Sequence, residues 1–549
     1  MIDMLESWRE RRTVTLNRRD FMRAGAITIG TTAVPAMAMA ALRSAVGDAN
    51  LSDATIMSLS NELDGTLILQ NSYIPSFEDA AKLFNSRFNP IRPLAIARCK
   101  NAADVQRSMR WCIANNIHFV ARAGGHSYCG WSSCEGLVID VGDLQDKSYD
   151  ASTGRVTFGS GMLLVDAYHY LGTNFQRAIP GGTCPSVGLS GLTLGGGQGM
   201  LSRQYGMTSD SLIGATVALY DGTDVYEVAC TEDNAHHDLL WALRGGGGGN
   251  FGIVTSLTFK TWPQATASWA SVEWNWSDAR KVLDFWMDWG PTVDPSISMS
   301  LKFRTPLVLD EHDDLIVGLE ACCTGSETDM LNILAPLLQP EIGTPTKLVH
   351  DGGWDWFDVA VLFGDCSDFS SPYDNCHFQS PKWPEGVLQQ WTYKSKSDFY
   401  KEAIPSAGFD AMEHWLRARH KNLDMPLLGQ IQFDLYGSAS VINQMPRDAT
   451  AFVHRDSICC AQYLAFWDPA DPCHTVDENM AWIRGFYQAM RPWASDESYQ
   501  NYCDNDLHDW AQRYYGSNLP ELRRIKSLYD PDNVFHFPQS IPPAMGGLL

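Results

Sequence analysis

Arg122-Ala123-Gly124-Gly125-His126-Ser127-Tyr128 is a short glycine-containing stretch, and further along the chain reads Gly181-Gly182-Thr183-Cys184-Pro185-Ser186-Val187-Gly188. A third run, Gly195-Gly196-Gly197, follows closely. Glycines let the backbone approach a phosphate and present its N–H groups to the anion. These runs therefore predict loops that hold a dinucleotide at both edges, with a histidine beside one edge and a cysteine beside the other.

A phosphate site alone leaves His126 and Cys184 unexplained. Taken singly, each has a structural interpretation, as a loop histidine and as a small buried cysteine. Together they resemble the flavin attachment of the berberine-bridge-enzyme-like oxidases, within the vanillyl-alcohol-oxidase and p-cresol-methylhydroxylase (PCMH) superfamily. There a histidine bonds the 8α-methyl carbon of FAD and a cysteine bonds ring carbon C6. The resemblance implies FAD attached twice, through His126 and Cys184, which are nucleophiles suited to that ring system.

The resemblance also implies further cofactor contacts. A third signature consists of five consecutive glycines, residues 245–249, followed by Asn250-Phe251-Gly252-Ile253-Val254. The other expected cofactor-binding residues are Arg122, Gly124, Gly125, Ser127, Val187, Gly188, Gly195, Gly196, Gly197, Gly252, Ile253 and Val254. A nicotinamide-binding Rossmann fold is the rival interpretation, but its fingerprint opens a helix after an early strand, whereas this glycine run lies deep in the chain.

The composition describes a large, acidic, globular protein. With 549 residues, 45% of them hydrophobic, the chain is long enough for two or more domains. A formal net charge of −23 argues against nucleic acid, an anionic membrane surface or an acidic polysaccharide as partner, and leaves neutral or cationic small molecules. The 14 cysteines show no metal-ligand spacing, so no metal site is expected; some pairs could oxidise after export, with Cys129 and Cys134 as one candidate close in sequence.

The N-terminus has the three parts of a twin-arginine export signal. Asn17-Arg18-Arg19-Asp20-Phe21 precedes a weakly apolar stretch from Ala24, and Ala36-Met37-Ala38-Met39-Ala40 follows it. We expect residues 1–40 to be removed on export to the periplasm or the cell exterior, leaving a protein with no membrane attachment. A membrane anchor is the alternative, but the apolar stretch is short and Pro35 interrupts it.

The rest of the chain divides by pattern and by the resemblance. The expected fold class is α+β, with a PCMH-type FAD-binding domain of two subdomains and a substrate domain whose antiparallel sheet is covered by helices. Local signals include helical spacing over 102–114 and a hairpin around Asp221-Gly222. The expected parts are a linker or loose arm over residues 41–65, the FAD-binding domain over 66–261, the substrate domain over 262–490, and a C-terminal segment over 491–549 that returns to the FAD-binding domain.

A strand and a C-terminal tyrosine are the candidates for the chemistry. Oxidising an alcohol needs a base for the hydroxyl proton, and a tyrosine, with its pKa of about 10, needs a proton acceptor behind it. Tyr502 is the candidate base and Asp434 the candidate acceptor. The stretch Gln430-Ile431-Gln432-Phe433-Asp434 alternates as a strand does, which puts its polar residues on one face. That face is either a solvated outer surface or a polar pocket.

A closer resemblance, to the gluco-oligosaccharide and chito-oligosaccharide oxidases, favours the pocket. Residues that line the sugar site of those enzymes match this chain at Tyr128, Gln432, Asp434, Gln462 and Tyr502. Those enzymes have a tryptophan where this chain has Gln430, which implies a different hold on a second sugar unit. The family residue three positions after the flavin cysteine gates oxygen, and a valine there, Val187, implies an oxidase.

The implied function is oxidation of a carbohydrate hydroxyl, the anomeric one, to a lactone, with molecular oxygen reduced to hydrogen peroxide. Tyr502 deprotonates the hydroxyl and passes the proton towards Asp434 while FAD takes the hydride. Between Trp262 and Trp493 lie 14 of the 19 tryptophans, a density compatible with a sugar or an aromatic substrate stacking on rings. Two alternatives stay open: an FAD-dependent oxidase of an aromatic or natural-product alcohol, and a secreted flavoprotein that binds a saccharide without turnover.

Overall fold

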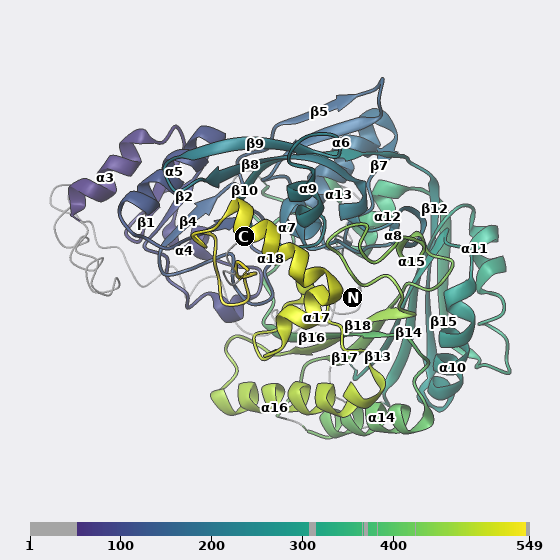
Figure 1. Cartoon of the computed structure of the whole chain (residues 1–549). Helices are drawn as coiled ribbons and strands as arrows, with labels where there is room; N and C mark the ends of the chain where they lie inside the picture. The colour runs from purple at the N-terminus through teal and green to yellow at the C-terminus, as the bar shows by residue number, and fades with distance from the viewer. Residues whose placement is uncertain are drawn as a thin grey trace.

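The computed structural model describes residues 52–544, apart from residues 307–313, 365, 367–371, 381, 382 and 423. Sheets of four, five and seven strands and one short two-stranded pair make up its β-structure. In Figure 1 the four-stranded and five-stranded sheets, in purple and blue, lie on one side of the molecule, and the seven-stranded sheet, in teal and green, lies on the other. This arrangement confirms the expected α+β fold class.

The region predicted to bind the cofactor contains two sheets, as a two-subdomain architecture requires. The first has the spatial order β1 (Thr66–Leu69), β2 (Ala95–Arg98), β4 (Leu137–Asp140), β3 (Phe119–Arg122). Strand β4 runs parallel to both β2 and β3. Parallel neighbours need a crossover, and helix α5 (Ala102–Ala114) supplies it between β2 and β3. The helix begins there because Asn101 caps the backbone N–H of Asp104.

The second sheet is antiparallel throughout. Its spatial order is β5 (Lys147–Asp150), β6 (Arg155–Gly159), β10 (Ile253–Lys260), β8 (Leu212–Tyr220), β9 (Val225–Thr231). The predicted hairpin joins β8 to β9, and Gly222 has the positive φ of 89° that such a tight turn demands. Helices α4 (Phe77–Ala81), α6 (Leu164–Phe175), α7 (Leu189–Leu194) and α9 (His237–Leu243) belong to this region, and β7 (Arg177–Ala178) pairs with β11 (Trp262–Pro263). Helix α8 (Ser202–Tyr205) instead contacts β13 (Ile297–Arg304) of the seven-stranded sheet.

The seven-stranded sheet is also antiparallel. Its spatial order is β15 (Pro345–Asp355), β12 (Thr266–Asn275), β14 (Ile316–Thr324), β13 (Ile297–Arg304), β17 (Gly429–Leu435), β18 (Cys459–Phe466), β16 (Tyr393–Tyr400). One hydrophobic core joins one of its faces to α10 (Ala279–Trp289), α11 (Glu327–Leu334), α14 (Ser406–His420) and α16 (Cys473–Met490). Ile431 and Phe433 of β17 lie in this core, so the alternating polar residues of the strand face the opposite side, towards the cofactor region.

The C-terminal segment contacts both halves of the molecule. Helices α17 (Trp510–Tyr515) and α18 (Leu519–Tyr529) follow a short 3₁₀ turn, Gln500–Tyr502, which lies against β16. Helix α18 packs on α9, and the buried ammonium of Lys526 donates to the carbonyl of Asn250 at 2.6 Å. These contacts anchor the segment on the cofactor region and place Tyr502 beside the large sheet.

Two expectations need correction, and one lies outside the described part. Residues 52–65 are not a loose arm, because Asp53–Glu62 form helix α3, and its apolar residues Ile56 and Leu59 are buried with residues of α5. Cys129 and Cys134 do not bond to each other; a disulfide joins Cys366 to Cys376. The export signal expected over residues 1–40 lies outside the described residues, among which no helix is long and apolar enough to cross a membrane.

Candidate active site

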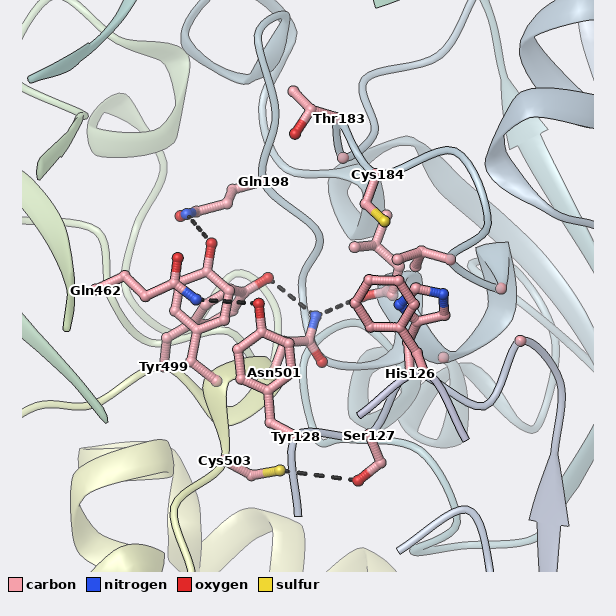
Figure 2. Close-up of a pocket in the computed structure, with 18 of the residues that line it drawn as sticks. His126, Ser127, Tyr128, Thr183, Cys184, Gln198, Gln462, Tyr499, Asn501 and Cys503 are labelled. Atoms are coloured by element: carbon pink, nitrogen blue, oxygen red, sulfur yellow. Dashed lines mark hydrogen bonds between the residues drawn. The ribbon is translucent and has the colours of Figure 1, made fainter. Parts of the chain in front are cut away.

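A cavity of about 790 Å³ lies between the glycine loops of the cofactor region and the polar face of the seven-stranded sheet (Figure 2). The predicted site residues that line it are Arg122, Gly124, Gly125, His126, Ser127, Tyr128, Cys184, Val187, Gly188, Gly252, Ile253, Val254, Gln430, Gln432, Gln462 and Tyr502. Asp434 and the run Gly195–Gly197 do not line it. The polar face of β17 is therefore a pocket wall rather than a solvated outer surface.

Two glycines bring the histidine loop and the cysteine loop together. A Cβ atom on Gly124 would lie 2.3 Å from the backbone nitrogen of Gly188, and one on Gly188 would lie 2.6 Å from that of Gly124. Any larger residue at either position would push the loops apart. Their contact places the Nε2 atom of His126 at 2.9 Å from the hydroxyl oxygen of Ser186, two residues after Cys184.

The environment of His126 keeps its imidazole neutral. Burial lowers its pKa to about 3, and the ring stacks on Phe84 with 4.0 Å between the centroids. A neutral imidazole has a free lone pair, which a protonated one lacks. His126 is therefore in the protonation state that a nucleophile needs.

The prediction that Gly195, Gly196 and Gly197 touch the cofactor needs correction. They lie behind the cavity wall, against the C-terminal segment: a Cβ atom on Gly195 would lie 2.0 Å from the Oδ1 atom of Asn501, and the N–H of Gly197 donates to the Tyr499 hydroxyl at 2.7 Å. Gly196 and Gly197 also have positive φ angles of 122° and 82°. Close packing on the C-terminal segment, rather than a phosphate, explains this run.

The hydrogen-bond partners of Arg122 indicate whether the cavity suits FAD. Its guanidinium pairs with Asp140 at 2.7 Å, and the side chain is only 5% exposed. Its buried Nη1 atom has no hydrogen-bond partner among the described residues. A buried N–H donor at a cavity lined by glycine backbone needs an acceptor, and the pyrophosphate of a dinucleotide supplies one. The residues present therefore fit FAD.

The sugar-site residues predicted from the resemblance meet in this cavity. Gln432 and Gln462 are direct cross-strand neighbours on β17 and β18. The Gln462 amide donates to the Tyr128 hydroxyl at 3.0 Å, and the Gln432 amide donates to the Asp434 carboxylate at 2.7 Å. The ring of Tyr128 stacks on that of Tyr502, with 5.3 Å between the centroids. Residues from four separate parts of the chain thus share one polar wall.

Gln198 connects Asp434 to Tyr502, and it was not among the residues predicted for the site. Its Nε2 atom donates to the Asp434 carboxylate at 2.8 Å and to the Tyr502 hydroxyl at 2.9 Å. Its Oε1 atom accepts from the Tyr436 hydroxyl at 2.7 Å, which fixes the orientation of the amide. The expected direct pairing of tyrosine and aspartate is therefore replaced by an amide bridge. Its position directly after the glycine run is the one signal that pointed to this residue.

Burial sets the protonation of the tyrosine and the aspartate. Burial raises the pKa of Tyr502 well above its ordinary value, and the nearby Asp434 charge raises it further. Burial also raises the pKa of Asp434, although hydrogen bonds from Ser300 and Gln432 and the charge of Lys302 act to lower it. At neutral pH Tyr502 is thus a phenol, and the Asp434 carboxylate, once ionised, is the group that can accept its proton.

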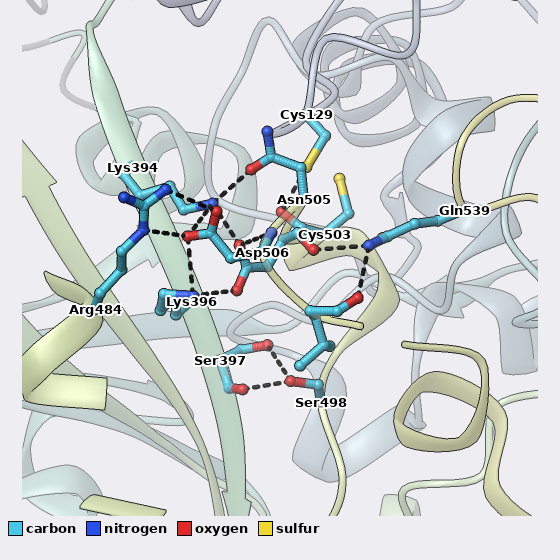
Figure 3. A network of polar contacts seen from close by, with 12 residues as sticks. Cys129, Lys394, Lys396, Ser397, Arg484, Ser498, Cys503, Asn505, Asp506 and Gln539 are labelled. Atoms are coloured by element: carbon cyan, nitrogen blue, oxygen red, sulfur yellow. Dashed lines mark hydrogen bonds and ion pairs between the residues drawn. The ribbon is translucent and has the colours of Figure 1, made fainter. Parts of the chain in front are cut away.

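A buried ionic cluster holds the segment that carries Tyr502 (Figure 3). The Asp504 carboxylate, two residues further on, pairs with the ammonium groups of Lys394 and Lys396 on β16, and all three side chains are at most 5% exposed. Lys394 also donates to Asn505 at 2.7 Å. A buried carboxylate with two cationic partners fixes the segment against the sheet.

Replacing Asp504 with asparagine is expected to lower the free energy of unfolding by about 1.5–3 kcal/mol, because two buried ammonium groups lose the nearer of the two carboxylates they share. The other carboxylate, that of Asp506, remains 3.4 Å from Lys394 and 3.3 Å from Lys396. Chemical denaturation measures the change. The matched control is Asp509→Asn, whose exposed carboxylate pairs with Arg513 and whose loss should cost at most about 1 kcal/mol. Equal losses in the two variants would contradict a special role for the cluster.

Comparison with known proteins agrees with this site. The family model described as "FAD binding domain" matches residues 93–225, and the one described as "Berberine and berberine like" matches residues 498–542. An uncharacterised FAD-linked oxidoreductase of Bacillus subtilis, YgaK, is 32% identical over 89% of this chain and 99% of its own length. The aclacinomycin oxidase of Streptomyces galilaeus is 27% identical over 84% of this chain and 87% of its own.

A solved structure, that of a chitooligosaccharide oxidase, has a TM-score of 0.77 and 25% identity, and covers 89% of this chain and 100% of its own. FAD is thus the cofactor that the glycine loops and Arg122 fit, and the reaction class is oxidation of a CH–OH group. The chain belongs to the berberine-bridge-enzyme-like family of FAD-linked oxidoreductases.

Proposed function

We propose that the protein is a secreted oxidase that converts the anomeric hydroxyl of a neutral saccharide to a lactone and reduces molecular oxygen to hydrogen peroxide. The observation that carries the proposal is the polar wall described above. Tyr128, Gln432, Gln462 and Tyr502 converge on the cavity, with Asp434 directly behind it. Amide and phenol groups arranged in this way suit the many hydroxyls of a sugar ring.

The side chains divide the work of binding and proton transfer. Gln432, Gln462 and Gln430 bind sugar hydroxyls. Tyr502 takes the proton of the reacting hydroxyl as it gives up its own phenolic proton, and the Asp434 carboxylate is the final acceptor of that second proton. Gln198 donates to both oxygens, so it cannot itself carry the proton between them. Its role is to hold the phenol and the carboxylate in place, while a hydroxyl or a water bridges their oxygens. Bound FAD supplies the two-electron acceptor and its reaction with oxygen.

The attachment of FAD, the use of oxygen and export belong to the same proposal. His126 and Cys184 line the cavity from adjoining loops, which supports attachment through both. Val187 lines it close to Cys184, where a small side chain leaves a path for oxygen. Export by the twin-arginine route, which moves folded proteins, is consistent with a cofactor that is bonded before transport.

The test is a peroxide assay over a panel of mono- and oligosaccharides, with identification of the oxidised product. Peroxide together with a lactone supports the proposal. Peroxide only with aromatic or natural-product alcohols would transfer the function to the second candidate, for which the 27% identity to aclacinomycin oxidase provides the precedent. If a saccharide binds but does not bleach the flavin spectrum under anaerobic conditions, the protein binds the saccharide without turning it over.

Replacing Gln198 with leucine is expected to slow anaerobic flavin reduction by about 10- to 100-fold, since hydrogen bonds to charged partners are worth about 1.5–3 kcal/mol. The dissociation constant of the sugar should change much less, because Gln198 holds Tyr502 and Asp434 rather than the ring. Stopped-flow spectroscopy at several sugar concentrations measures the rate constant of flavin reduction and the dissociation constant of the sugar separately. A variant that loses only sugar affinity would make Gln198 a binding residue instead.

The rate of flavin reduction should fall as the pH decreases, since only the ionised Asp434 accepts a proton. Its raised pKa places this fall at higher pH than for an ordinary aspartate, and activity is retained above the pKa. A stopped-flow pH profile measures this fall at low pH, and Asp434→Asn should remove the pH dependence together with most of the rate. If the same pH dependence persists in that variant, it belongs to another titrating group.

A further inference from the structure

Two cysteines lie directly beside the stacked tyrosines of the active site. Tyr128 is followed by Cys129, and Tyr502 is followed by Cys503. Because the two tyrosine rings stack nearly in parallel, at an interplanar angle of 16°, the next residues of both segments also come together. The structure thus pairs two cysteines that are 374 positions apart in the chain.

The Cys129 thiol lies directly against Cys503. It donates to the carbonyl oxygen of Cys503 at 3.1 Å. Figure 3 shows the two sulfur atoms beside each other. Neither cysteine is in a disulfide, and both are 6% exposed. A disulfide between them needs a side-chain rotation that brings the two sulfur atoms to about 2 Å from each other.

The environments of the two thiols differ in a way that suits a reactive and a resolving cysteine. Cys503 lines the cavity, whereas Cys129 does not. Burial opposes the Cys503 thiolate, but hydrogen bonds from the side chain and backbone of Cys129 and from Ser127 outweigh it and lower its pKa. Burial raises the pKa of Cys129. A small oxidant in the cavity therefore meets the more acidic thiol first.

We propose that Cys503 is an oxidation site, that Cys129 is its resolving partner, and that hydrogen peroxide converts the pair to a Cys129–Cys503 disulfide. The Cys503 thiolate attacks one peroxide oxygen, which gives a sulfenic acid and, after protonation, one water. The Cys129 sulfur then attacks the Cys503 sulfur, the S–O bond breaks, and a second water leaves. Two thiols lose two electrons and two protons, and one peroxide becomes two waters.

The bond has two consequences for the site. It ties the loop that carries His126 and Tyr128 to the segment that carries Tyr502, so both walls of the cavity keep their spacing. It also stops the oxidation of Cys503 at a reversible stage, before an irreversible sulfinic acid adds charge beside the catalytic tyrosine. An enzyme that releases peroxide into its own cavity needs such protection, and this source of peroxide is the one step that rests on the proposed function.

The experiment treats the purified holoprotein with added hydrogen peroxide and no substrate, so that it does not depend on turnover. Thiols are then blocked by alkylation in denaturant, and peptide mass spectrometry follows each cysteine. In the wild type we expect a linked pair of peptides that contain Cys129 and Cys503, two hydrogen atoms lighter than the unlinked pair and separated by dithiothreitol. In Cys129→Ser we expect Cys503 to gain one and then two oxygen atoms, because no thiol resolves it.

The matched control is Cys112→Ser, which changes a buried cysteine outside the cavity and should leave the cross-link intact. Retention of both thiols in reduced form in the wild type would overturn the proposal, as would over-oxidation of Cys503 at the same rate in the wild type and in Cys129→Ser. A cross-link without peroxide production from any sugar would instead count against the proposed function alone.

Discussion

Replacing Tyr502 with phenylalanine is expected to lower the rate constant of anaerobic flavin reduction by roughly 10²–10⁴, the usual contribution of a positioned acid or base. The hydroxyl is the only group removed, and the stacked ring against Tyr128 remains. The dissociation constant of the sugar should therefore change by at most a few fold. Stopped-flow spectroscopy without oxygen measures both constants from the bleaching of the flavin.

Tyr529→Phe is the matched control, because it removes a phenolic hydroxyl that donates to Asp238 outside the cavity. Its flavin reduction should match that of the wild type. If Tyr502→Phe also reduces its flavin at a near-normal rate, Tyr502 takes no proton, and Asp434 acts on the substrate through water. A double variant, Tyr502→Phe with Asp434→Asn, that is no slower than either single variant would show that the two act as one unit.

Simultaneous replacement of His126 and Cys184 by alanine is expected to remove all covalent attachment of FAD. Acid-denatured wild-type protein should stay yellow and carry the mass of one FAD. Each single variant should also stay yellow, because the other bond remains. The double variant should give a colourless precipitate with FAD in solution, as absorbance and intact-mass spectrometry will show.

Ser186→Ala serves as the control for the local environment of the attachment site. It removes the hydroxyl that contacts His126 and leaves both nucleophiles in place, so the flavin should remain bonded. Release of all FAD from the denatured wild type would disprove attachment at both residues. Release from one single variant would show that the remaining residue makes no bond.

Local patterns predicted much of the fold. The 3.6-residue period gave helix α5, and the Asp221-Gly222 signal gave the β8–β9 hairpin, because hydrogen bonds between near neighbours determine both. Alternation along β17 correctly put its polar residues on one face. The tryptophan-rich region was less informative: Trp274, Trp286 and Trp482 are core residues, whereas Trp269 and Trp391 line the cavity.

The sequence by itself determined the strand and helix periods, because these depend on neighbours along the chain. Its resemblance to a known family predicted the type of cofactor loop and the residue types of the polar cavity wall. Only the tertiary structure decided which glycines reach the cavity, which side of β17 is enclosed, and that Gln198 bridges Asp434 and Tyr502. Those partners lie 236 and 304 positions from Gln198. Contacts over such separations form only when whole sheets and segments pack together, and no local pattern in the chain encodes that packing.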